Sequence, residues 1–173
     1  MKIERIKRIE IMKYFIASLL IVVGLITPVS CTVKSIHFNQ DCAGYLKQAA
    51  DANTAAIALE RVTKALDYIE RNRLTEGYTS VLWTTEDENI GFWYENIKAC
   101  KAELEACLNS SQLEQTNVLM KVRESLMDGK ELTIPCGISR YPNNASWLIF
   151  GWLSFLLIMG GIIWIFYTFE NNY

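Results

Sequence analysis

The sequence predicts an all-α membrane protein in which two transmembrane helices flank an extracytoplasmic, antiparallel three-helix domain. Two stretches without a charged side chain, 14–33 and 141–169, bracket the chain. Each is long enough for an α-helix to cross the hydrocarbon core of a bilayer, which takes about 20 apolar residues. The residues between them are polar and rich in Ala, Leu, Lys and Glu, a composition that favours helices.

These patterns divide the 173 residues into five segments. A basic N-terminus (1–13) precedes the first apolar segment (14–33), the helical domain covers 34–144, the second span covers 145–168, and a short tail (169–173) follows. Lys and Arg outnumber Asp and Glu in the basic N-terminus. By the positive-inside rule we expect an integral membrane protein with a cytoplasmic N-terminus and a domain in the periplasm, lumen or extracellular space.

The first apolar segment also has the features of a secretory signal. From Met12, which is an alternative start to Met1, a short basic region is followed by an apolar core and a small-residue end. The small residues before Cys31 are similar to the end of a lipoprotein signal, although Pro28 stands where that pattern has Leu, Val or Ile. Three alternatives stay open: a retained signal anchor, lipidation at Cys31, or cleavage nearby. All three place the helical domain on the same side of the membrane.

The second span has aromatic side chains towards both ends, as expected where rings settle at the two membrane interfaces. Neither span contains Asp, Glu, Lys, Arg or His. Ionisable residues inside a membrane usually mark ion paths and proton relays, so we interpret both spans as anchors and not as a transport pathway. The aromatic residues are Trp147 and Trp152 at one end, and Trp164, Tyr167 and Phe169 at the other.

Three helices are expected between the spans. The first covers about 41–73, the second opens at a cap at Thr84 or Thr85, and the third runs from a cap at Ser111 to about Met127. A loop or short extended piece, 78–83, separates the first two, and residues 130–144 form a connector to the second span. Apolar stripes at three- and four-residue spacing indicate the buried faces: Leu59, Val62, Leu66 and Ile69; Trp93, Ile97, Cys100, Leu104 and Cys107; Leu119, Val122 and Leu126.

Four cysteines besides Cys31 lie in the domain, an even number that permits two disulfides outside the cytoplasm. Cys100 and Cys107 are separated by about 10 Å along one predicted helix, more than the roughly 7 Å that a disulfide tolerates. If the first two helices are antiparallel, Cys42 lies near Cys107, and Cys136 is left to reach Cys100. We therefore hypothesise the disulfides Cys42–Cys107 and Cys100–Cys136, with buried unpaired thiols on an apolar seam as the alternative.

Motifs that carry chemistry are missing from the sequence. It has no CxxC pair, a single histidine (His37), and an acidic run at 86–88 without the spacing or glycine of a calcium loop. We therefore expect no catalytic residue, metal or cofactor. The net charge of −2 without a basic cluster also makes nucleic acid a poor partner.

The remaining functional signal is a group of aromatic side chains around the acidic run: Tyr78, Trp83, Phe92 and Tyr94. Outward aromatic residues beside polar ones are typical of protein-binding surfaces, although these rings could equally pack on a membrane interface. We hypothesise a non-enzymatic, membrane-anchored accessory or assembly protein whose partners are the lipid bilayer and another membrane or extracytoplasmic protein. The alternatives are the input subunit of a membrane sensor without its own output domain, and a thiol-redox protein.

Overall fold

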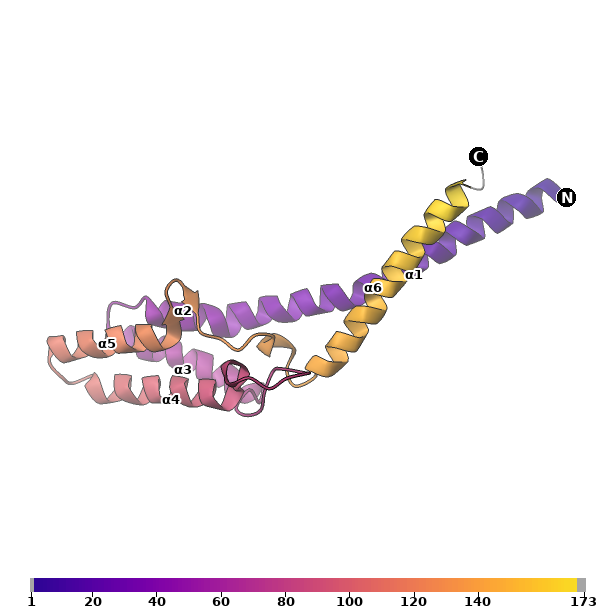
Figure 1. Cartoon of the computed structure of the whole chain (residues 1–173). Coiled ribbons are helices and arrows are strands. Elements are labelled where there is room, and N and C mark those ends of the chain that lie inside the picture. The colour runs from indigo at the N-terminus through magenta and orange to yellow at the C-terminus, as the bar shows by residue number, and fades with distance from the viewer. Residues whose placement is uncertain (1, 171–173) are drawn as a thin grey trace. The chain divides into compact units, whose positions relative to one another are not determined.

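Helices make up most of residues 2–170, which the computed structural model describes, and this confirms the predicted all-α class (Figure 1). The chain is grouped in two compact units. The first combines the N-terminal part up to Val33 with the C-terminal part from Ala145, and the second extends from Lys34 to Asn144.

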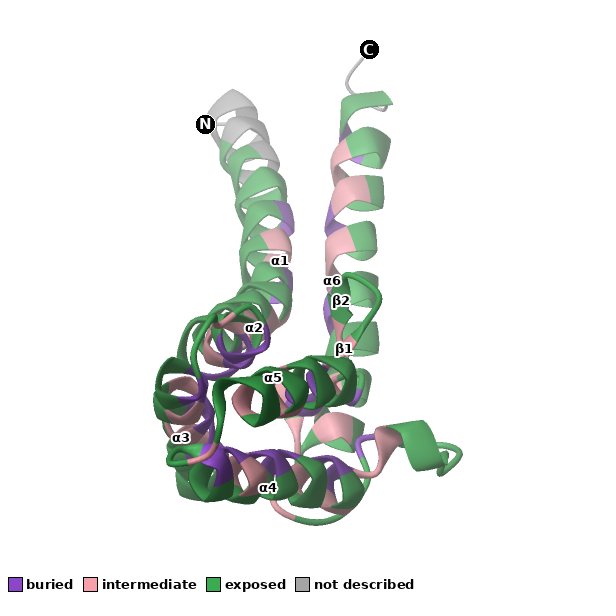
Figure 2. Cartoon of the chain, turned by 90° about the vertical axis from the view of Figure 1, so that its left-hand side faces the viewer, coloured by how far each residue is buried: buried purple, intermediate pink, exposed green. Residues whose placement is uncertain are grey.

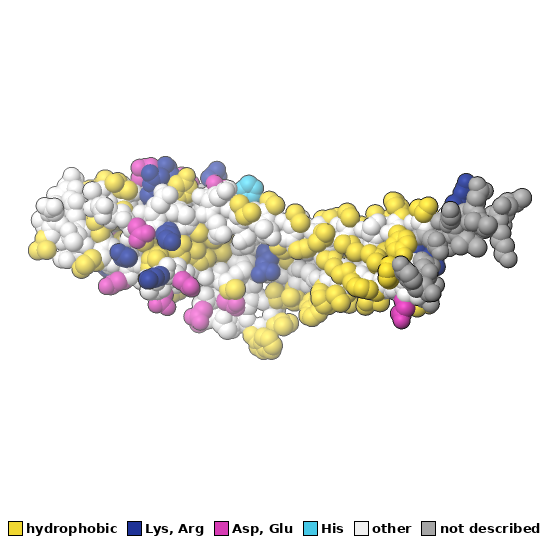
Figure 3. All heavy atoms as spheres, turned by 90° about the horizontal axis from the view of Figure 1, so that it is seen from above, with side chains coloured by type: hydrophobic (Ala, Val, Ile, Leu, Met, Phe, Trp, Pro, Cys, Tyr) yellow, Lys and Arg dark blue, Asp and Glu magenta, His cyan; other side chains and the backbone are white. Residues whose placement is uncertain are grey.

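The first unit consists of two long apolar helices, most of α1 (Lys2–Phe38) and α6 (Asn144–Glu170). Both are long and apolar enough to cross a membrane, and only 11% of the apolar window of each is buried inside the protein. Figure 3 shows hydrophobic side chains covering the surface of these helices, while acidic and basic side chains gather on the helical domain. Apolar surface of this kind and extent is typical of helices that are solvated by lipid.

The two helices of this unit are antiparallel and approach each other through small residues. A Cβ atom at Gly161 would lie 3.0 Å from the carbonyl oxygen of Ala17, and one at Gly24 would lie 3.0 Å from the carbonyl oxygen of Ser154. Ala17 and Gly24 are seven residues apart on α1, as are Ser154 and Gly161 on α6. This spacing keeps the small residues on one side of each helix, so the two helices approach each other along one seam.

Pro28 lies inside α1 and creates the acceptor for a hydrogen bond between the two helices. Proline has no N–H, so the carbonyl of Gly24, four residues earlier, lacks its helical donor. The hydroxyl of Ser154 on α6 donates to that carbonyl oxygen. A side chain of the second helix therefore satisfies the backbone group that proline leaves free in the first, which is how membrane helices tolerate proline.

The second unit is a four-helix bundle, whereas the sequence predicted three helices. The predicted first helix is divided into α2 (Gly44–Ala50) and α3 (Ala55–Arg71), and these are followed by α4 (Ile90–Cys107) and α5 (Gln112–Leu126). Each helix packs against the next, and α5 returns to pack against α2, so the four surround one core (Figure 2). A π-helical turn, Asn39–Ala43, joins the end of α1 directly to α2.

The division between α2 and α3 comes from side chains that compete with helical hydrogen bonds. Residues 51–54 read Asp-Ala-Asn-Thr within an alanine-rich sequence. Thr54 adopts an extended conformation, and its hydroxyl accepts a hydrogen bond from the backbone N–H of Ile57 at 3.3 Å. The short polar residues therefore end one helix and cap the next, an effect that outweighs the helix propensity of the surrounding alanines.

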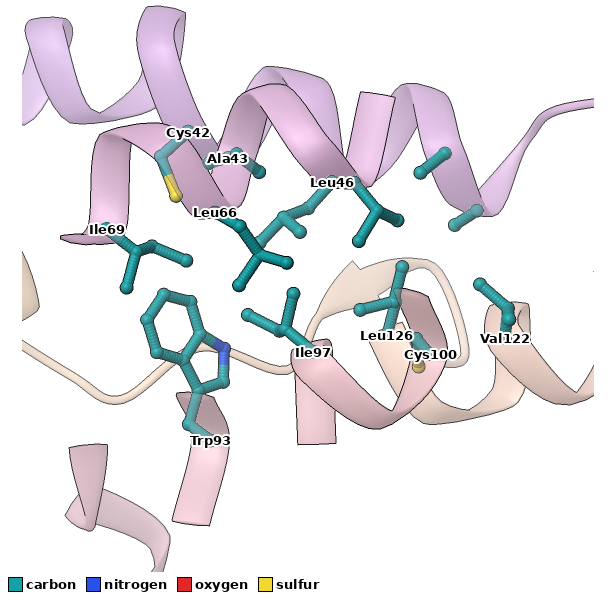
Figure 4. Close-up of a cluster of buried hydrophobic side chains, with 14 of the residues drawn as sticks. Cys42, Ala43, Leu46, Leu66, Ile69, Trp93, Ile97, Cys100, Val122 and Leu126 are labelled. Atoms are coloured by element: carbon teal, nitrogen blue, oxygen red, sulfur yellow. The ribbon is translucent and has the colours of Figure 1, made fainter. Parts of the chain in front are cut away.

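The core of the bundle contains most of the predicted apolar stripes. Every member of the predicted α4 stripe is buried, as are Val62, Leu66 and Ile69 on α3, while Leu59 is only partly buried. Figure 4 shows five of these side chains near Leu46 from α2 and Val122 and Leu126 from α5; the five are Leu66, Ile69, Trp93, Ile97 and Cys100. Burial of these apolar side chains is the main term that holds the four helices together.

Two connections of the bundle shape its functional surface. A hairpin of two short strands, β1 (Met127–Asp128) and β2 (Glu131–Leu132), follows α5 directly. Gly129 occupies its turn with a φ of +62°, a conformation that favours glycine. The loop between α3 and α4 ends in a 3-10 turn, Glu86–Glu88, and Asn89 caps α4 in place of the predicted Thr84 or Thr85.

Candidate functional site

A groove of about 730 Å³ lies where the start of α4 faces the end of α5 and the residues that follow it. We call it the acidic groove. It is lined by Glu86 and Asp87 of the 3-10 turn, by side chains from the first half of α4 and its cap Asn89, and by residues 125–135 except Met127, Gly129 and Lys130. Its volume is within the range of about 300–1,000 Å³ that is usual for small-molecule and cofactor sites.

Seven of the residues that line the acidic groove are apolar, and we call the surface they form its floor. Trp93, Ile97 and Leu126 reach it from the buried core, and Leu132, Ile134 and Pro135 continue it along the connector. Phe92 also lines the groove, and 65% of its surface is exposed. A large ring that stays exposed beside a recess is an apolar contact available to a ligand.

The charged side chains that line the groove are all acidic: Glu86, Asp87, Asp128 and Glu131. None of the four takes part in an ion pair among residues 2–170. Lys130 follows Gly129 in the hairpin but is not a lining residue. Four carboxylates around a low-dielectric floor create a negative potential that attracts cationic groups.

The predicted aromatic surface is divided between two faces of the bundle. Asn89 links two of its members, because its side-chain oxygen accepts from the N–H of Phe92 at 3.1 Å and its amide donates to the hydroxyl of Tyr78 at 3.3 Å. Trp83 lies in the preceding loop and is 76% exposed. Tyr94 is directed to α3, where its hydroxyl donates to the carboxylate of Glu70 at 3.0 Å. The structure therefore brings Phe92 and Tyr78 together at the start of α4 and places Tyr94 elsewhere.

All five cysteine thiols are free in the structure, so it gives no support to the disulfides Cys42–Cys107 and Cys100–Cys136. Cys42, Cys100 and Cys107 are buried, and Cys136 is exposed. Burial raises the pKa of Cys42 to about 12 and also raises the pKa of Cys100. A thiol that stays protonated is a poor nucleophile and a poor redox group.

The extra helix explains why Cys42 does not meet Cys107. Cys42 lies before α2, and the chain reverses once between α2 and α3 and again between α3 and α4. The π turn of Cys42 is therefore beside the end of α3, as the contact between the rings of Phe38 and Tyr68 shows, with centroids 6.0 Å apart. Figure 4 places Cys42 beside Ile69 and near Trp93, at the opening turn of α4, whereas Cys107 is the last residue of that helix.

Cys31, the candidate for lipidation, is half-buried within α1. Among the described residues, no group of three or more His, Cys, Asp or Glu side chains is arranged to hold a metal ion.

The hairpin and the residues after it form the part of the groove that the sequence does not predict, because the pattern of residues 130–144 indicates only a connector. The signal was Asp128-Gly129, a dipeptide that favours a tight turn, between the apolar residues Met127 and Leu132. The turn folds Glu131 and Leu132 back to pair with Asp128 and Met127, just after α5, and so supplies the second wall of the groove.

No protein-family model, curated protein or solved structure matches this chain. The functional argument therefore depends on the geometry and charge of the chain itself.

Proposed function

We propose that this chain is a non-enzymatic, membrane-anchored accessory or assembly protein whose helical domain binds a basic segment of another protein in the acidic groove. One observation carries the proposal: the groove combines an apolar floor with four carboxylates and has no basic lining residue. A Lys or Arg side chain could pair with the rim while a neighbouring apolar side chain is buried on the floor.

The two parts of the groove have different roles in this proposal. Burial of apolar surface contributes affinity, at about 25 cal/mol per Å² removed from water. The carboxylates contribute specificity and speed of association, because they attract basic segments and repel acidic ones. The exposed ring of Phe92 provides a contact of the aromatic type that dominates many protein interfaces.

In this proposal α1 and α6 cross the bilayer as a membrane hairpin and hold the binding domain at its surface. The excess of Lys and Arg among the first 13 residues supports a cytoplasmic N-terminus, and the domain then lies on the opposite side. The seam between α1 and α6 supports a retained first span. Removal of residues up to Ser30 would take away Ala17 and Gly24, which pack against α6.

A charge-reversal experiment tests the groove. The full-length protein is placed in nanodiscs of zwitterionic lipid, and the binding of an eight-residue peptide of alternating Lys and Leu is measured by fluorescence anisotropy. We expect Asp128→Lys/Glu131→Lys to lower the affinity at least about tenfold, on the order of 1.4 kcal/mol. Added salt should weaken the binding of the wild-type protein, because the rim contacts are exposed.

The matched control is Asp67→Lys/Glu124→Lys, which makes the same change of net charge at exposed sites outside the groove. It should keep the wild-type affinity, and a peptide of alternating Glu and Leu should not bind. Equal loss in the two double variants would show that only net charge matters. In that case the acidic groove would not be the binding site.

A further inference from the structure

An exposed apolar segment of the helical domain lies outside the acidic groove. Residues 78–85 contain no charged side chain. At their centre Val81, Leu82 and Trp83 are 43%, 72% and 76% exposed. We call Val81–Trp83 the apolar finger. Three consecutive apolar side chains held in solvent are costly in water, and such surfaces usually mark a site of interaction with protein or membrane.

Residues 76–79, which form the base of the finger, are held by hydrogen bonds to the residues where the second span begins. The side-chain amide of Asn144 donates to the carbonyl of Thr79 at 2.6 Å, and the hydroxyl of Tyr141 donates to the carbonyl of Glu76 at 2.8 Å. Thr79 is buried at this contact. The other side of the base is also held, because the N–H of Ile90 donates to the carbonyl of Gly77 at 2.9 Å.

Chain connectivity then places the finger near the membrane surface. Asn144 is the first residue of α6, and the uncharged residues that follow it are those that would enter the bilayer. Trp83 is four residues after Thr79, so it can lie at most about 14 Å from it. The headgroup layer on each side of the hydrocarbon core is about 5–8 Å thick. The finger can therefore reach this layer from its base.

We propose that the apolar finger inserts into the bilayer interface. Trp is among the residues that prefer the headgroup level, because its ring is amphipathic, and Val and Leu add apolar contact with the upper acyl chains. The finger carries no Lys or Arg, so its ligand is the boundary between headgroups and acyl chains and not an anionic headgroup. This proposal concerns a different surface from the acidic groove and stands independently of it.

Photolabelling of the full-length protein tests the proposal. The probe is phosphatidylcholine with a diazirine on an upper acyl carbon, incorporated into phosphatidylcholine nanodiscs, and adducts are located by tandem mass spectrometry. We expect adducts on residues 81–83 in addition to those on the spans. Leu113 is the internal control, because it is 74% exposed but lies just after the far end of α4, about 27 Å along that helix from the base of the finger. It should remain unlabelled.

Two variants distinguish a finger that is inserted into the interface from one that only lies near the lipid. Leu82→Glu/Trp83→Glu should abolish labelling throughout 78–85 while the spans keep theirs, because two carboxylates are excluded from the interface. Leu113→Glu should leave the labelling pattern unchanged. The proposal is overturned if residues 81–83 are unlabelled in the wild type while the spans are labelled. It is also overturned if the double variant is labelled as strongly as the wild type.

Discussion

Cys42 illustrates how one position of the bundle determines the chemistry of its side chain. Burial against the end of α3 raises the pKa of its thiol to about 12, whereas Cys136 is exposed on the connector. At pH 8 the thiolate fraction of Cys42 is then about a thousandfold below that of a thiol with a pKa near 9. We expect iodoacetamide to alkylate Cys136 in the folded protein and to leave Cys42 unmodified, as measured by peptide mass spectrometry.

Denaturation without reductant provides the control for this labelling. Cys42, Cys100, Cys107 and Cys136 should all react once the protein is unfolded, because their thiols are free in the structure. If they resisted alkylation until a reductant was added, the disulfides that the sequence suggested would be present after all.

The raised pKa of Cys42 also affects the stability of the fold. Because the folded state keeps this thiol protonated, its contribution to the free energy of unfolding is complete below about pH 9 and is lost as the pH rises towards 12.

At the scale of single elements, two neighbouring glycines of α6 allow a matched test of the membrane hairpin. A Cβ at Gly161 would lie 2.7 Å from the Cγ1 atom of Ile21 and 3.0 Å from the carbonyl oxygen of Ala17, whereas a Cβ at Gly160 would meet nothing within 4 Å. We expect Gly161→Ala to destabilise the pairing of α1 with α6 by about 1–3 kcal/mol through overpacking. Gly160→Ala should be neutral, or stabilising by up to about 1 kcal/mol through its helix propensity.

Unfolding of the full-length protein in mixed micelles, followed by circular dichroism, would measure both changes. Equal effects of the two substitutions would contradict the antiparallel seam. The sequence of the second span contains Gly151, Ser154, Gly160 and Gly161, but it does not identify which residues of the first span they contact. These contacts are set by the register between two helices that are far apart in the chain. One of them also requires the carbonyl of Gly24, which Pro28 leaves free to accept a hydrogen bond from Ser154.

The helical domain shows which features of an element can be read from sequence. The stripes of α3 and α4 were predicted because burial repeats with the period of the helix. The turn at 51–54 was missed because alanine on both sides hides a break that depends on the cap at Thr54. That single break divides the predicted first helix into α2 and α3, and the chain reverses its direction between them. It also moves Cys42 to the opposite end of α4 from the position on which the disulfide hypothesis depended.

At the scale of the whole molecule, composition predicted the apolar and polar parts of the chain, while the acidic groove had to be seen in three dimensions. One of its walls comes from residues 86–97 and the other from residues 125–135, which are far apart in the sequence. Carboxylates at 86–87 and at 128 and 131 appear unrelated in the sequence. The return of α5 beside α4 brings them to the rim of the same recess.

The membrane hairpin leads to a prediction about the mature protein. If residues 14–33 were removed, Ser154 and Gly161 on α6 would lose the partners against which they pack, and the hydroxyl of Ser154 would face lipid without its acceptor. We therefore expect protein extracted from its native membrane to retain this segment and to carry no acyl group at Cys31. Intact-mass spectrometry after denaturation and alkylation without reductant should show one alkyl group for each of the five cysteines. A chain that begins at Cys31 with added acyl mass would instead establish a lipid anchor, and α6 would then be the only one of the two spans left in the protein.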